Sequence, residues 1–236
     1  MKRTLAATLI CLVLLLPKIS GYGQHLQAVG VSGSFNIARL HSSTQEFRLG
    51  SVVINPQADQ SNDETGNGPT VFGRWQVGQG GWYVQPELGH VSALETPVGL
   101  TYSSGNFPYS SRRIRRVDIR LLGGYQSGPL RLFAGPSVGR YLRDSRTPNF
   151  IDSNVQAAAE ALDADRSSIQ WAVQAGAGVS LWRLDVNARY EWGLTPYSRT
   201  VVFQQQAFHF NRNLQQLIME VGFQLYKRPL QGYKVP

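Results

Sequence analysis

The chain has 236 residues, a formal net charge of +8 at pH 7 and a single cysteine, Cys11, which lies in an amino-terminal apolar run. The rest of the chain therefore has no disulfide, no cysteine nucleophile and no cysteine-ligated zinc. A basic charge can indicate nucleic-acid binding, but the arginines are interleaved in predicted strands instead of forming one patch, so we expect no nucleic acid partner.

The amino terminus has the order of features typical of a secretory signal peptide. Lys2 and Arg3 precede an apolar run from Leu5 to Leu16, and small residues follow up to Gly23. We predict a signal peptide over residues 1–23. No later segment has the roughly 18 consecutive apolar residues that a membrane-spanning helix needs.

Eight segments then alternate apolar and polar residues with a period of two, which is typical of strands whose two faces differ. In chain order they cover residues 29–37, 71–77, 82–90, 116–125, 130–139, 169–181, 184–194 and 217–225. The segments 39–69, 94–112 and 196–212 are polar and are predicted to be loops. Within the remaining long connection, a short helix is predicted over 154–164, capped by Asp152 or Ser153.

Long connections and short turns alternate strictly between these strands. This asymmetry is typical of bacterial outer-membrane barrels, which have short periplasmic turns and longer extracellular loops. The strands 169–181 and 184–194 are also long enough for a bilayer, which needs about 9 to 11 tilted residues. We predict an all-β fold, an eight-stranded antiparallel up-and-down transmembrane β-barrel over 24–228, with a polar tail over 229–236. The even strand number places both termini in the periplasm.

The alternation alone leaves open a soluble barrel with an apolar interior. The composition of the polar face favours the membrane, because small residues and opposite charges suit an eight-stranded interior that only side chains fill. Buried charges must be paired. The predicted lumen charges are Arg74, Glu87, Asp118, Arg120, Arg131, Asp185, Arg189, Glu191 and Glu220. A structural ion-pair core is the favoured interpretation, and a proton or ion pathway is the alternative.

Three segments carry a family resemblance. They are Gln85-Pro86-Glu87-Leu88-Gly89, the run from Phe133 to Gly139 and the run from Ala188 to Thr195. Through them the chain resembles the PorT-like outer-membrane β-barrel family and, in architecture, the eight-stranded OmpA and OmpX type of barrel. The resemblance implies a role in secretion or envelope assembly, and its motifs describe barrel packing instead of catalytic chemistry.

One pattern resembles a catalytic site. His90 and Ser92 share the outward face of one strand near a long loop, and Glu95 is the nearest carboxylate. An outward His-x-Ser with a carboxylate resembles the arrangement in outer-membrane lipid A deacylases, since a nucleophile needs a base and an orienting group within reach. The alternative is an interfacial histidine beside a loop serine.

A dense basic cluster is formed by Arg112, Arg113, Arg115 and Arg116. Arginine forks suit lipopolysaccharide phosphates, so the cluster is a candidate lipid contact, with a solvated rim as the alternative. The histidines outside the strands lack metal-ligand spacing, so we expect no metal and no cofactor.

Two hypotheses follow. The first is a non-enzymatic outer-membrane barrel that contacts lipid and lipopolysaccharide and binds an envelope or secretion protein. The second is a barrel enzyme that modifies lipid A.

Overall fold

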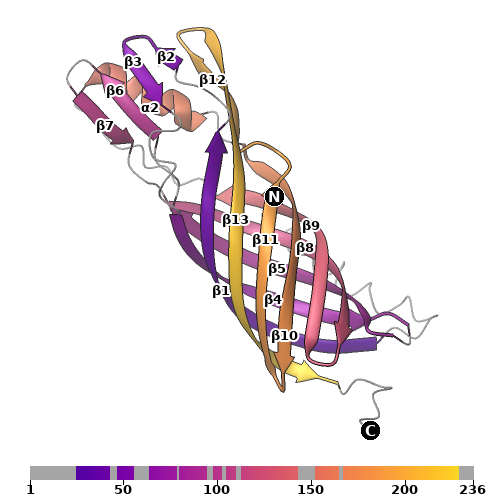
Figure 1. Cartoon of the computed structure of the whole chain (residues 1–236). Helices are drawn as coiled ribbons and strands as arrows, with labels where there is room; N and C mark the ends of the chain where they lie inside the picture. The colour runs from indigo at the N-terminus through magenta and orange to yellow at the C-terminus, as the bar shows by residue number, and fades with distance from the viewer. Residues whose placement is uncertain are drawn as a thin grey trace, which may run out of the picture.

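The computed structural model describes residues 25–42, 47–55, 64–78, 80–94, 98–102, 105–109, 113–142, 152–164 and 167–228. The predicted signal peptide and the polar tail lie outside the described residues. Figure 1 shows an elongated barrel that carries a smaller folded unit at one end.

Eight antiparallel strands form the barrel, and each pairs with the next along the wall. The strands are β1 His25–Ser42, β4 Glu64–Gln76, β5 Trp82–Leu94, β8 Arg113–Ser127, β9 Leu130–Leu142, β10 Ile169–Leu181, β11 Leu184–Gly193 and β13 Gln206–Lys227. Pairing of β1 with β13, from Ala28 with Lys227 to Ser42 with Arg212, closes the wall. The predicted fold class is confirmed.

The three short turns lie at one end of the barrel, the end where β1 begins and β13 finishes (Figure 1). Two of them contain glycines with positive φ, Gly78 at 71° and Gly128 at 57°, a backbone conformation that glycine adopts without steric cost. In the third, Trp182 takes φ 54°. We call this end of the barrel the short-turn mouth.

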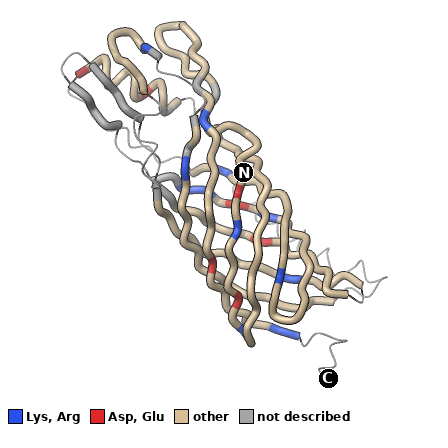
Figure 2. The backbone as a smooth tube through the Cα atoms, viewed as in Figure 1, with Lys and Arg blue, Asp and Glu red and all other residues tan. Residues whose placement is uncertain are grey.

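Side chains alternate along the barrel strands between a buried polar face and an exposed apolar one. On β9, for example, Arg131 is 1% exposed while its neighbour Leu132 is 66% exposed. Figure 2 shows charged residues distributed along the strands of the barrel. The predicted assignment of faces is confirmed: the polar face lines the lumen, which excludes a soluble barrel with an apolar interior. None of the helices in the described part of the chain has the length and hydropathy to cross a membrane.

The opposite end carries a folded unit in place of the predicted loops. It consists of a four-stranded sheet in the order β2-β3-β6-β7, the helix α2 Ser153–Ala164, and β12 Ser198–Phe203, which pairs with the first part of β13. The bounds of the small strands are β2 Phe47–Leu49, β3 Val52–Asn55, β6 Val98–Tyr102 and β7 Gly105–Tyr109. We call this unit the head. The prediction of loops over 39–69, 94–112 and 196–212 is therefore wrong for these segments.

The head has its own hydrophobic core. Its buried residues are Leu49, Val52, Ile54, Val155, Ala158, Ala159, Leu162, Val201 and Phe203. The four residues from α2 recur at helical spacing, so one face of the helix packs against β2, β3 and β12. Asp152 Oδ1 accepts the backbone N–H of Asn154 at 2.8 Å and of Val155 at 3.3 Å, which confirms the predicted helix and its cap.

Prolines are tolerated in the barrel wall at gaps in strand pairing, and Pro69, Pro86 and Pro136 each lack a partner on one side. Pro69 lies in β4, inside a segment predicted to be a loop, and the β4–β5 register has no partner for it. Pro86 on β5 also lacks a β4 partner, as predicted for a residue that has no amide hydrogen to donate. The strand β4 begins at Glu64, although its proline and glycines had indicated a loop up to residue 69.

Candidate functional site: the ion-paired lumen

The structure places all nine predicted lumen charges inside the barrel. None of their residues is more than 4% exposed, and Arg116, which is 2% exposed and pairs with two of them, joins them. We call these ten residues the lumen network. It contains five arginines and five carboxylates, and the buried Arg212 at the head end of the lumen adds a sixth cation.

The head-side part of the lumen network is built around Glu191 on β11. Arg116 Nη2 lies 2.7 Å from Glu191 Oε1, and the same guanidinium pairs with Asp118 and donates to Gln170. Amide groups of Gln174 and Gln216 also donate to the Glu191 carboxylate. Glu191 is therefore held by donors from several strands.

The position of Arg116 corrects a prediction. Its side chain is 2% exposed, so its assignment to an outward lipopolysaccharide-binding cluster is wrong. The physical reason is strand parity: Arg116 shares the inward face of β8 with Asp118 and Arg120. Arg115 is exposed. Arg112 and the side chain of Arg113 lie outside the described part of the structure.

Glu87 on β5 connects the middle of the lumen network. Its Oε2 lies 3.2 Å from Arg120 Nη1 and 2.7 Å from Arg189 Nη1. Arg189 Nη2 continues to Glu220 Oε2 at 2.9 Å, and Arg120 Nη2 continues to Asp118 Oδ2 at 3.1 Å. Each arginine here therefore contacts two carboxylates.

Toward the short-turn mouth, two arginines share one carboxylate, that of Asp185. Its Oδ2 lies 2.9 Å from Arg74 Nη2 and its Oδ1 lies 3.3 Å from Arg131 Nη2. Arg74 Nε also donates to Gln85 at 2.7 Å, and Gln85 Nε2 donates to Glu87 at 2.7 Å. This amide joins the two halves of the lumen network.

Aromatic residues lie at the head end of the lumen. The rings of Tyr141 and Tyr197 meet edge to face with centroids 5.1 Å apart. The guanidinium groups of Arg116 and Arg212 lie over these rings, at 6.0 and 5.6 Å from the respective centroids. Together with the ion pairs, they fill an interior that eight strands make only wide enough for side chains.

The paired arrangement suits a structural core. Arginine and carboxylate groups buried in a low-dielectric interior are tolerated when each is paired and hydrogen-bonded. Sequence reasoning missed the amide partners Gln170, Gln174 and Gln216, although Gln170 and Gln174 alternate with apolar residues in the predicted strand 169–181, which was a usable signal; Gln216 precedes the predicted last strand. Arg212 and Tyr197 were missed because they lie in a segment predicted to be a loop.

His90 and Ser92 lie on the outward face of β5, and both are half-buried. The acidic residues Glu87 on β5 and Asp118 on the neighbouring β8 point into the lumen, away from that face. Glu95, the predicted carboxylate partner, lies outside the described residues. The part of the chain that the structure describes contains no group of three or more His, Cys, Asp or Glu residues suited to a metal ion.

Comparison with known proteins identifies one matching family. Residues 23–199 match the family described as outer membrane protein beta-barrel domain. No curated protein matches the sequence.

Solved structures with a similar fold include three membrane proteins. Neisserial surface protein A is 10% identical, with 85% of this chain and 99% of that chain covered at a TM-score of 0.45. The translocator domain of the autotransporter NalP from Neisseria meningitidis is 11% identical, with coverage of 94% and 97% and a TM-score of 0.31. The outer membrane protease OmpT from Escherichia coli is 12% identical, with coverage of 86% and 95% and a TM-score of 0.30.

Proposed function

Because the chain belongs to the outer membrane protein beta-barrel domain family of the bacterial outer membrane, we propose that it is a non-enzymatic envelope component whose head binds a protein partner. The barrel anchors the head in the membrane. In this proposal the short-turn mouth, where β1 begins and β13 ends, faces the periplasm, as short turns do in outer-membrane barrels, and the head lies outside the cell. The resemblance to PorT-like barrels supports a role in secretion or envelope assembly.

The head is the observation that carries this proposal. A long connection that only joins two barrel strands needs no hydrophobic core. The connections that form the head nevertheless bury nine residues in a shared core. Ordering so much chain costs conformational entropy that a surface loop avoids. The ion-paired lumen, which side chains fill, argues against a pore as the main activity. Binding a partner requires a surface whose residues are held in place, and this requirement explains why the head is ordered.

Adjacent valines on β12 provide a test. Val201 is fully buried in the head core, whereas Val202 is 61% exposed. Val201→Asp is expected to unfold the head and abolish partner capture, because it buries an unpaired charge. Val202→Asp adds the same charge to the surface and is expected to leave the head folded. The measurement is co-purification from outer membranes in mild detergent, with protease resistance reporting on the head.

The two variants separate the possible results. A stoichiometric partner that is lost with Val201→Asp and kept by a barrel with native heat-modifiability supports the proposal. Absence of any partner with the wild-type chain contradicts it, as does a partner that Val201→Asp retains after its head has become protease-sensitive.

A lipid A-modifying enzyme is the second candidate, and the outward position of both His90 and Ser92 near the head end of β5 favours it. Under the first proposal, His90→Ala and Ser92→Ala leave lipid A unchanged and partner capture intact. Under the enzyme alternative, either substitution abolishes a lipid A modification that the wild-type chain produces. Mass spectrometry of lipid A from strains with and without the gene distinguishes the two.

A further inference from the structure

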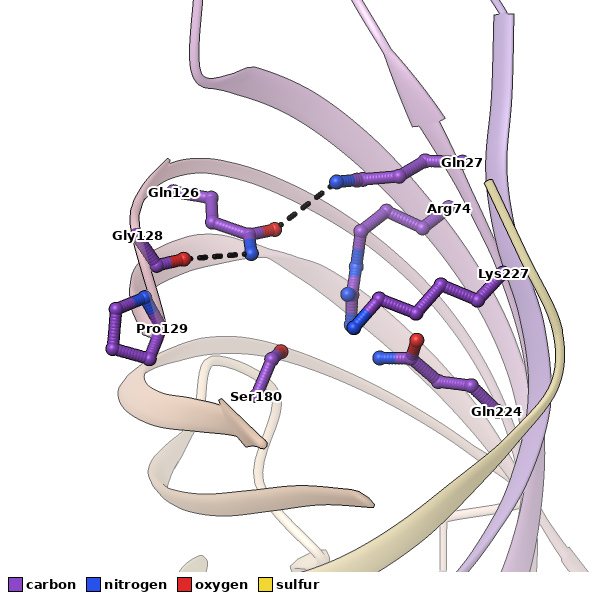
Figure 3. Close-up of a pocket in the computed structure, with 8 residues that line it drawn as sticks. All are labelled: Gln27, Arg74, Gln126, Gly128, Pro129, Ser180, Gln224 and Lys227. Atoms are coloured by element: carbon purple, nitrogen blue, oxygen red, sulfur yellow. Dashed lines mark hydrogen bonds between the residues drawn. The ribbon is translucent and has the colours of Figure 1, made fainter. Parts of the chain in front are cut away.

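The short-turn mouth contains a cavity of about 230 Å³. Five strands and the turn before β9 contribute to its lining. Figure 3 shows that the side chains of Arg74, Lys227 and Gln224 converge on this space, with Gln27 beside Arg74 and Gln126 across from them. The cavity lies at the end of the barrel opposite the head (Figure 1).

Positive charge is in excess at this mouth. Arg74 and Arg131 share the single carboxylate of Asp185, while the other three arginines of the lumen network face four carboxylates. Lys227 adds a further cation at the rim, where its ammonium donates to the carbonyl of Trp182. The short-turn mouth therefore holds three cations, Arg74, Arg131 and Lys227, around the one carboxylate of Asp185.

Arg74 has donor capacity left for a ligand. Its side chain is 1% exposed, and its Nε and Nη2 are used by Gln85 and Asp185. These two bonds use two of the five N–H donors of the guanidinium group. A guanidinium group and a lysine ammonium that lie side by side bind oxyanions such as carboxylate and phosphate.

A buried acceptor points to the other half of the ligand. Gln224 is 1% exposed, and its amide nitrogen donates to Asp185 at 2.8 Å. Its Oε1 is buried and has no hydrogen-bond partner in the described structure. Because an unpaired buried acceptor is costly, the site is completed by a group that donates an N–H or O–H.

We propose that this mouth cavity binds a small ligand with a carboxylate or phosphate group, held by Arg74 and Lys227, and a neighbouring N–H or O–H donor, accepted by Gln224. Two sources share this chemistry, a peptide carboxyl terminus and a phosphorylated polyol. The cavity is far from the head, so the proposal stands or falls independently of partner capture.

Calorimetry on the full barrel in detergent, at constant ionic strength, tests the proposal. The probes are N-acetyl-dialanine, its carboxyl-terminal amide and glycerol 3-phosphate. Saturable binding of the free acid but not the amide identifies a peptide terminus, and saturable binding of glycerol 3-phosphate identifies a phosphorylated polyol. Lys227→Gln is expected to weaken the binding about tenfold, the effect of one charge-assisted hydrogen bond.

Control variants guard against general charge effects and misfolding. Lys227→Arg keeps the charge and is expected to bind within about twofold of wild type, because the rim site is exposed and tolerates a longer side chain. Arg115→Gln removes an exposed cation from the other end of β8 and is expected to leave binding unchanged. Absence of binding by both anionic probes, equal binding by Lys227→Gln, or equal weakening by Arg115→Gln overturns the proposal.

Discussion

Replacing Asp185 with asparagine is expected to lower the free energy of unfolding of the barrel by about 3 to 5 kcal/mol, the usual cost of removing one partner of a buried ion pair. The effect is large because one carboxylate serves both Arg74 and Arg131, and both are 1% exposed. Asparagine has nearly the same shape, so the loss reports on charge and not on a cavity. Urea-induced unfolding in lipid vesicles, followed by heat-modifiability, measures it.

A matched surface substitution provides the control for Asp185→Asn. Glu160 on α2 is exposed and accepts a hydrogen bond from Gln156 at 2.7 Å. Glu160→Gln is expected to change the unfolding free energy by no more than about 0.5 kcal/mol. If Asp185→Asn also stays within this range, water at the short-turn mouth screens the two arginines, and the lumen network does not depend on Asp185.

The barrel could be predicted from sequence because its two faces meet environments of opposite polarity. Leu121 faces outward and is 50% exposed, while the preceding Arg120 is 2% exposed in the lumen. Such a contrast recurs at every second residue, so a local pattern is sufficient to identify the strands. The pairing partners of Arg120, in contrast, depend on register, which the pattern does not contain.

The head could not be predicted in the same way. Leu49 and Val52 belong to very short strands, and they pack against Val155 and Leu162, which lie about a hundred residues later in the chain. Short strands give too few alternations to distinguish them from a polar loop. The helix was predicted because its alanine-rich segment and its Asp152 cap are local signals.

The misassignment of Arg116 has a different cause. Its neighbours in the sequence are basic, and proximity along the chain indicated one cluster. In a strand, successive side chains point to opposite faces, so Arg115 and Arg116 occupy different environments. Strand parity was therefore the stronger of two available signals, and it placed Arg116 with Asp118 and Arg120.

Arginine substitutions at two exposed valines are expected to distinguish lipid from water as the solvent of each surface. Val71 is 54% exposed and pairs with Val31 and Leu88 in the middle of the barrel wall. Val71→Arg is expected to cost about 2 to 4 kcal/mol, the range for a cation on the lipid face near the bilayer midplane. Urea titration of the barrel in lipid vesicles provides the measurement.

Val202 on β12 is 61% exposed and belongs to the head, so it provides the matched comparison. Val202→Arg is expected to change stability by no more than about 0.5 kcal/mol, because its side chain meets water. Equal costs at the two valines would place both surfaces in one environment and contradict the division into a membrane barrel and an aqueous head. A cost confined to Val71 locates the membrane on the wall and leaves the head free to contact a partner.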